Sequence, residues 1–298
     1  MLKKERAVGE KNDVVIRVVI YVILALLAIS IIVPVAWVFM ASVKENREFY
    51  GNPFTLPEGF HFQNFVDAWT KARMGDYFMT SVMITALSLA ILLVVALPAA
   101  YVLSRYNFVG RKVLNGGFMA GLFINVNYIV VPIFLMFVAG DRLLNQWFGK
   151  TFFLNNPFVV SLVLASTTLP FTIYLLSSYL ATLPKDYEEA AYVDGAGYFT
   201  TMVRIILPMA KPSIITVILF EFLAYWNEYI ISMTMLTDPS GPRTLPVGLL
   251  NLMKAQNAKA EYGQMYAGLV LVMIPTLLLY ICVQKKLTEG MTVGGLKG

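Results

Sequence analysis

Two carboxylates, Glu221 and Glu228, lie inside one long apolar stretch of the chain. A charge at the centre of a bilayer costs about 2.5–3.5 kcal/mol, so such residues usually face a bundle interior or a wet cavity. Their spacing of seven residues is nearly two helical turns, which predicts that both share a helix face with Tyr225 and Ser232. This row could hydrogen-bond to the hydroxyl groups of a polar solute in a membrane path. Alternatively, Glu221 is protonated or paired within a helix interface.

Further polar residues that could line the membrane path lie earlier in the sequence, but their signal is weaker. Asn125 and Asn127, with Pro132, could bend a helix and turn polar groups toward the same cavity. The alternative is that both amides hydrogen-bond to a neighbouring helix and that Pro132 makes an ordinary kink.

Several kinds of chemistry are excluded by residue type. Cys282 is the only cysteine and His61 the only histidine, so the sequence offers no disulfide framework and no multi-histidine metal site. Gly149-Lys150-Thr151 is not a phosphate-binding loop, because that motif needs a further glycine where Leu144 stands. We therefore expect a chain that binds no cofactor, hydrolyses no nucleotide and is not an enzyme.

The elements that position these residues are membrane spans. The chain has 298 residues, of which 58% are hydrophobic and only 14% charged, and this composition excludes an ordinary soluble enzyme. Apolar runs of about 20 residues, the length that a bilayer core requires, predict an all-α membrane protein with six transmembrane helices. The runs are 18–43, 77–103, 113–139, 157–180, 213–236 and 263–283.

Lysine and arginine are distributed unevenly between the two sides. The N-terminal segment 1–17, loops 104–112 and 181–212 and the tail 284–298 hold 14 of them, and the opposite loops hold 9. Because cytoplasmic loops carry the excess, we expect both termini in the cytoplasm, around a six-span domain at 18–283.

The loop 181–212 is long enough to have its own structure. Pro184 predicts a helix start, Asp194-Gly195 ends this first helix, and a second short helix is closed by Leu207-Pro208. Small residues and carboxylates gather around the first turn, where another protein's surface could approach the backbone closely. They are Glu188, Glu189, Ala190, Ala191, Asp194, Gly195, Ala196 and Gly197.

The spacing in this loop resembles the EAA loop of permease subunits of bacterial binding-protein-dependent ABC importers. The matching positions are Glu189, Ala190, Ala191, Gly195, Ile205, Leu207 and Pro208. The resemblance implies a type I ABC importer permease-like fold, in which the first short helix is a cytoplasmic coupling helix that docks on the ATP-hydrolysing subunit.

Other segments extend the resemblance over nearly the whole chain. Ser42-Val43-Lys44 and Trp226-Asn227-Glu228 look like motifs of the carbohydrate-uptake branch, although Thr80 stands where an asparagine is usual. The ending is similar to the tail of the maltose-type smaller permease, which reaches into the ATPase dimer. Its last residues are Gly294, Gly295, Leu296, Lys297 and Gly298.

The resemblance implies a sugar importer subunit in the bacterial cytoplasmic membrane, with Asn227 added to the translocation path. Its implied partners are a second permease subunit, two ATPase subunits that use ATP and Mg, and an extracytoplasmic sugar-binding protein, with no nucleic acid. A rival hypothesis is a secondary transporter in which Glu221 and Glu228 relay protons. The six spans and the EAA loop argue against a secondary transporter. Neither feature selects one sugar as the cargo.

Overall fold

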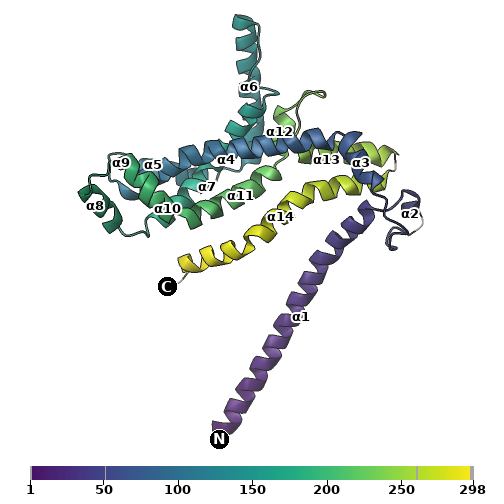
Figure 1. The fold of residues 1–298 in the computed structure, drawn as a ribbon, viewed down its shortest axis with the longest axis horizontal. Helices are drawn as coiled ribbons and strands as arrows, with labels where there is room; N and C mark the ends of the chain where they lie inside the picture. The colour runs from purple at the N-terminus through teal and green to yellow at the C-terminus, as the bar shows by residue number, and fades with distance from the viewer. Residues whose placement is uncertain (1, 51, 260, 296–298) are drawn as a thin grey trace. The chain divides into compact units, whose positions relative to one another are not determined.

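The computed structural model describes residues 2–50, 52–259 and 261–295, and among these residues every regular element is helical (Figure 1). The chain divides into two compact units. Unit 1 comprises Met1–Lys71 and Leu252–Leu271, and unit 2 comprises Ala72–Asn251 and Val272–Gly298. One division lies just past residue 71, before the first long helix of unit 2, and the other two fall within α13 (Leu245–Lys259) and α14 (Tyr262–Gly295).

Unit 1 contains α1 (Leu2–Ser42) and two short helices, α2 (Arg47–Tyr50) and α3 (Gln63–Thr70). Past the end of α1, the fully buried Lys44 donates from Nζ to the carbonyl of Pro53 at 2.9 Å. The Asn64 side chain donates to the carbonyl oxygens of Ser42 and Lys44 at 3.0 and 2.8 Å. The bond to Ser42 satisfies a carbonyl that the end of α1 leaves unpaired.

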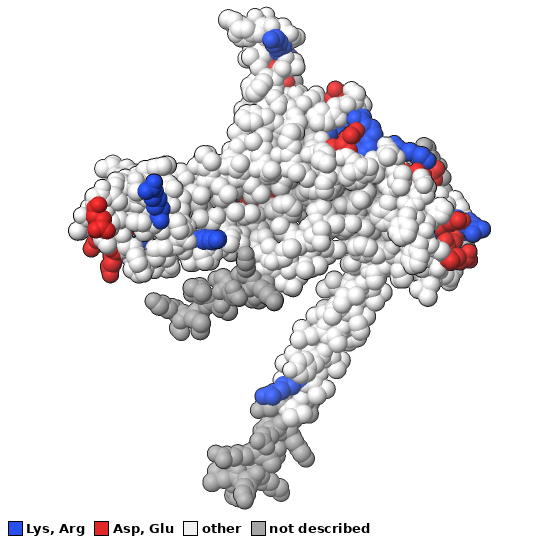
Figure 2. All heavy atoms as spheres, in the orientation of Figure 1, with Lys and Arg blue, Asp and Glu red and all other residues white. Residues whose placement is uncertain are grey.

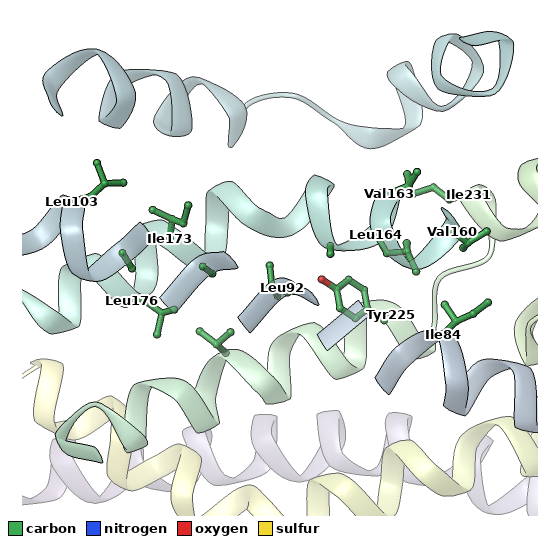
Figure 3. Close-up of a cluster of buried hydrophobic side chains, with 14 of the residues drawn as sticks. Ile84, Leu92, Leu103, Val160, Val163, Leu164, Ile173, Leu176, Tyr225 and Ile231 are labelled. Atoms are coloured by element: carbon green, nitrogen blue, oxygen red, sulfur yellow. The ribbon is translucent and has the colours of Figure 1, made fainter. Parts of the chain in front are cut away.

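Unit 2 is built around two long helices, α4 (Met74–Arg105) and α7 (Pro157–Leu180), which pack along each other. Figure 3 shows Ile84 and Leu92 of α4 together with Leu164 of α7 and Tyr225 of α11 in one apolar cluster. In Figure 2 the visible spheres over these helices are largely white, which marks residues other than Lys, Arg, Asp and Glu. The other helices of unit 2 are α5 (Arg111–Gly121), α6 (Val126–Phe148), α8 (Asp186–Val193), α9 (Tyr198–Thr201), η1 (Met202–Ile206), α10 (Leu207–Met209), α11 (Lys211–Trp226) and α12 (Ile230–Met235).

Five helices in the described part of the chain are long and apolar enough to cross a membrane. They are Ile16–Ser42, Met74–Arg105, Val126–Phe148, Pro157–Leu180 and Tyr262–Gln284. A sixth span is reached when Tyr198–Met209 and Lys211–Trp226, which meet at a bend of 75°, are taken together. The chain is therefore a multi-pass membrane protein, and four of the six predicted runs coincide closely with spans.

The predicted run 113–139 was wrong as a single helix. The chain leaves helical structure between α5 and α6, and the apolar span is α6. Asn125 causes this break, because its Oδ1 accepts the Asn127 backbone N–H at 2.9 Å and so caps α6. The span consequently extends past the predicted end and includes Asp141 and Arg142.

Candidate functional sites

The turn after α8 has the geometry that the Asp194-Gly195 signal predicts. Gly195 has φ +80°, and its N–H donates to the carbonyl of Tyr192 at 3.1 Å. The N–H of Ala196 donates to the carbonyl of Ala191 at 2.9 Å, which completes a Schellman ending. A Cβ on Gly195 would meet no atom within 4 Å, so the glycine is needed for its backbone conformation and not for space.

The small and acidic residues of the EAA loop divide between two faces. Glu189, Ala190, Asp194 and Gly195 are exposed, and Figure 2 shows acidic side chains gathered at α8. Glu188 and Ala191 are buried, whereas Ala196, Ile205 and Leu207 are half-buried and Pro208 is exposed. The exposed part is an uncovered carboxylate and small-residue surface of the kind that a partner protein can approach closely.

The buried face of α8 is held against the end of α4. Arg105 Nε lies 3.4 Å from Glu188 Oε1, with only 3% and 10% of the two side chains exposed. The hydroxyls of Tyr106 and Tyr192 are hydrogen-bonded at 2.7 Å. Burial, followed by this hydrogen bond, raises the pKa of Tyr106 to about 12, so its hydroxyl keeps its proton at neutral pH. No pattern within the loop indicates Arg105 or Tyr106 as partners of α8, because both precede α8 by a long stretch of chain.

The second half of the loop agrees, to within one residue, with the expectation that Leu207-Pro208 closes a second short helix. The helical backbone runs from α9 through the π-helical turn η1 into α10, and the bend comes at the fully buried Ala210. Pro208 lies in the last turn of the helical run that starts at Tyr198 and ends at Met209. Pro212 stands in the first turn of α11, where the missing N–H costs no hydrogen bond.

The predicted run 213–236 was also wrong as one continuous helix. Helix α11 ends at Trp226, and α12 begins at Ile230. The Glu228 carboxylate accepts the N–H groups of Ile231 and Ser232 at 2.6 and 3.1 Å and so caps α12. Glu221 and Glu228 therefore do not lie on one face of a single helix.

A cavity of about 270 Å³ lies at this break between α11 and α12. It brings together four of the predicted path residues, Asn127, Tyr225, Asn227 and Glu228. Its full lining is Val126, Asn127, Leu164, Thr167, Thr168, Ala224, Tyr225, Asn227, Glu228, Tyr229, Ile230 and Ile231. The lining is mainly apolar with a few polar groups, which is typical of small-molecule sites.

The other three predicted path residues do not line this cavity. Asn125 is the cap of α6, and the buried Ser232 donates its hydroxyl to Glu228 at 2.8 Å. Glu221 is 3% exposed and accepts a hydrogen bond of 3.3 Å from Thr172 on α7. Its Oε2 is buried with no hydrogen-bond partner among the described residues.

The last predicted site is the C-terminal tail. Gly294 and Gly295 are the final residues of α14. Leu296, Lys297 and Gly298 lie outside the described residues, so the contact expected of the tail stays a prediction.

Comparisons with solved structures confirm the fold. The chain is similar to a chain in the crystal structure of a bacterial ABC transporter involved in the import of the acidic polysaccharide alginate, with a TM-score of 0.74 and 22% identity. The match covers 92% of this chain and 97% of that one. It confirms the expected fold class, an all-helical permease of the type I importer kind.

Curated relatives confirm the resemblance to the carbohydrate-uptake branch. The chain is 33% identical to the diacetylchitobiose uptake system permease protein NgcG of Streptomyces coelicolor, over 92% of this chain and 87% of the relative. It is 29% identical to the trehalose/maltose transport system permease protein MalG of Thermococcus litoralis, over 97% and 99%. A family model described as the binding-protein-dependent transport system inner membrane component matches residues 6–293. The chain therefore belongs to the family of inner membrane components of binding-protein-dependent transport systems.

Proposed function

We propose that this chain is the permease subunit of an ATP-driven importer of sugars, of oligosaccharide size, and that its EAA loop receives the motion of the ATPase. One observation carries the proposal: Glu189, Ala190, Asp194 and Gly195 form an exposed surface on a helix whose other side is fixed to α4 by the buried Arg105–Glu188 pair. A surface that is both uncovered and firmly attached to a span can accept a partner and pass on its movement. The names of the relatives support a carbohydrate as cargo.

The rest of the assembly follows from the same proposal. This chain pairs with a second permease subunit to enclose the path, and two ATPase subunits bind ATP and Mg and dock on the EAA loops. An extracytoplasmic sugar-binding protein delivers the cargo. The loop 181–212, both termini and the tail Gly294–Gly298 then lie on the cytoplasmic side of the bacterial membrane.

Within the membrane, we assign this chain's share of the path to the cavity at the α11–α12 break. The Tyr225 hydroxyl, the Asn127 and Asn227 amides and the Glu228 carboxylate are groups that can donate to or accept from sugar hydroxyls. Glu221 lies behind this cavity, buried between α7 and α11, and we assign it to the helix interface.

A proton-coupled secondary transporter is the less favoured alternative. A relay would need Glu221 and Glu228 to exchange protons, yet Glu228 is engaged by α12 and the helix ends between the two carboxylates. The two hypotheses also differ in their energy source. Only the alternative predicts uptake by this chain alone in liposomes that carry a pH gradient and no ATP.

Sidedness and docking can be tested in one set of single-cysteine variants. With Cys282 replaced by serine, cysteines are placed at the exposed Asp194 and at the exposed Lys150 of the opposite predicted side. In intact cells, an impermeant maleimide should label Lys150→Cys and spare Asp194→Cys. In inside-out vesicles, bound ATPase subunits should protect Asp194→Cys from the reagent, and stripping them should expose it. Labelling of Asp194→Cys from the cell exterior would overturn the proposal.

A further inference from the structure

The contact between α8 and α4 joins residues far apart in the sequence. Arg105 is the last residue of α4, and Glu188 lies in the first turn of α8. Their charged groups approach to 3.4 Å, with nine-tenths or more of each side chain buried. No neighbouring segment of the chain forces this approach, because α5, α6 and α7 intervene between the two helices.

Burial makes this pair obligatory for the local structure. A buried charge whose partner moves away is left without compensation, which is far more costly than the loss of an exposed pair. Arg105 Nε and Glu188 Oε1 have no hydrogen-bond partner among the described residues, so the ionic contact between these two atoms is what compensates them. Glu188 therefore cannot leave Arg105 while the surrounding structure stays closed.

Aromatic side chains surround the pair and reinforce the same connection. Tyr101 and Tyr106 on the α4 side both contact the ring of Tyr198 at the start of α9, with ring centroids 5.5 and 5.4 Å apart. Tyr101 and Tyr106 also contact each other edge-on at 5.8 Å. The Tyr106–Tyr192 hydrogen bond adds a second polar link between the end of α4 and α8. The polar contacts therefore fix the end of α4 to α8, and the ring contacts fix it to the start of α9.

We infer that Arg105 and Glu188 are positioning residues that make α8 and the end of α4 move as one body when the ATPase subunits move. The inference rests on the proposed function. Under this inference the two adjacent glutamates have different roles. The exposed Glu189 faces the ATPase subunit, whereas the buried Glu188 faces inward and passes the displacement to α4. Without the pair, the largely exposed segment 181–185 that joins α7 to α8 would take up the movement instead.

The test measures the α4–α8 distance by electron spin resonance in the complete transporter. Spin labels are attached to cysteines at Val94 of α4 and Val193 of α8, both exposed, in a Cys282→Ser background. Distances are recorded without nucleotide and after trapping with ATP and vanadate. In the otherwise native chain, we expect one narrow distribution that is the same in both states.

Loss of either charge should uncouple the two helices. In Glu188→Gln and Arg105→Gln, we expect the distribution to broaden or to shift by about 1–2 Å or more on trapping, the scale of helix shifts in switching proteins. The swapped pair Arg105→Glu/Glu188→Arg should restore the narrow distribution. Asp186→Asn removes an exposed carboxylate of the same helix and should change nothing.

Each remaining outcome decides the matter. Native distributions in both single variants, or a native distance that changes on trapping, would overturn the inference. If a single variant fails to assemble, the swapped pair decides: restored assembly with a narrow distribution supports the inference, and failed assembly contradicts it. Failure of the unsubstituted chain to retain any ATPase subunit would instead refute the proposed function, and the nucleotide-free distances would still test the pair.

Discussion

The hydroxyl of Ser232 donates a hydrogen bond of 2.8 Å to the carboxylate of Glu228. Together with the backbone N–H groups that this carboxylate accepts, the bond starts α12 after a break in the apolar run. An acidic side chain at a helix start also opposes the positive end of the helix dipole. Glu228 therefore stabilises the start of α12 in addition to lining the cavity.

Replacing Glu228 with alanine should destabilise the region around α12. The variant loses a charged acceptor of three hydrogen bonds, and we expect a cost of about 1–3 kcal/mol. The measurement is the thermal unfolding midpoint of the purified transporter. Glu228→Gln keeps one acceptor oxygen, so its unfolding midpoint should lie between those of the native chain and of Glu228→Ala. An unchanged midpoint in Glu228→Ala, with weakened sugar uptake alone, would show that the carboxylate serves only the cargo.

Membrane spans could be predicted from the sequence where the apolar run is uninterrupted by a capping group. Helices α4 and α7 agree closely with the predicted runs 77–103 and 157–180, because composition and length decide a span. The breaks before α6 and α12 were missed, because each depends on one polar side chain, Asn125 or Glu228, that turns back onto nearby backbone N–H groups. A count of apolar residues cannot detect such a bond.

The candidate sites likewise include features that local sequence predicts and features that depend on a distant residue. The turn at Asp194-Gly195 follows from local backbone chemistry, so the sequence predicts it correctly. The burial of Glu188 depends on Arg105, and no pattern within the loop reveals which of two adjacent glutamates faces inward. The expectation that Glu221 and Glu228 share one helix face requires a continuous helix, and the structure instead ends α11 between the two residues.

Asp141 should contribute strongly to stability although it lies in a membrane span. Its carboxylate accepts the backbone N–H groups of Phe152, Phe153 and Leu154 at 2.6, 2.8 and 2.9 Å, and the residue is 6% exposed. Asp141→Ala leaves these N–H groups without their acceptor, and we expect a loss of about 3 kcal/mol or more. Thermal unfolding and faster amide exchange at residues 152–154 are the measurements.

A matched control for Asp141 is Asp67→Ala. Asp67 pairs with Lys71 on an exposed helix surface, and the hydrogen bonds from Lys71 and Gln63 lower its pKa. Exposed pairs contribute little to stability, so the unfolding midpoint should hardly move. Equal midpoints for the two alanine variants would contradict the structural role of Asp141.

Gly195→Ala should weaken the EAA loop through its backbone. The left-handed conformation at φ +80° costs a residue with a Cβ about 1–2 kcal/mol, and no neighbouring atom adds a clash. Asparagine tolerates this conformation better, so Gly195→Asn should retain more ATPase than Gly195→Ala on purification of the transporter. Equal retention in the two variants would mean that the glycine serves close approach of the partner and not backbone geometry.

Gly248→Ala should be the more damaging of the two glycine substitutions, for a steric reason. A Cβ at Gly248 of α13 would lie 2.1 Å from Cδ2 of Tyr77 on α4, closer than packed atoms can come. Overpacking of this kind costs about 1–3 kcal/mol, which should appear as a lower unfolding midpoint. Tyr77→Leu removes the obstructing ring, so the double variant Tyr77→Leu/Gly248→Ala should be less destabilised than the sum of the single variants. Strict additivity would show that α13 moves away from Tyr77 and that this contact does not limit the packing.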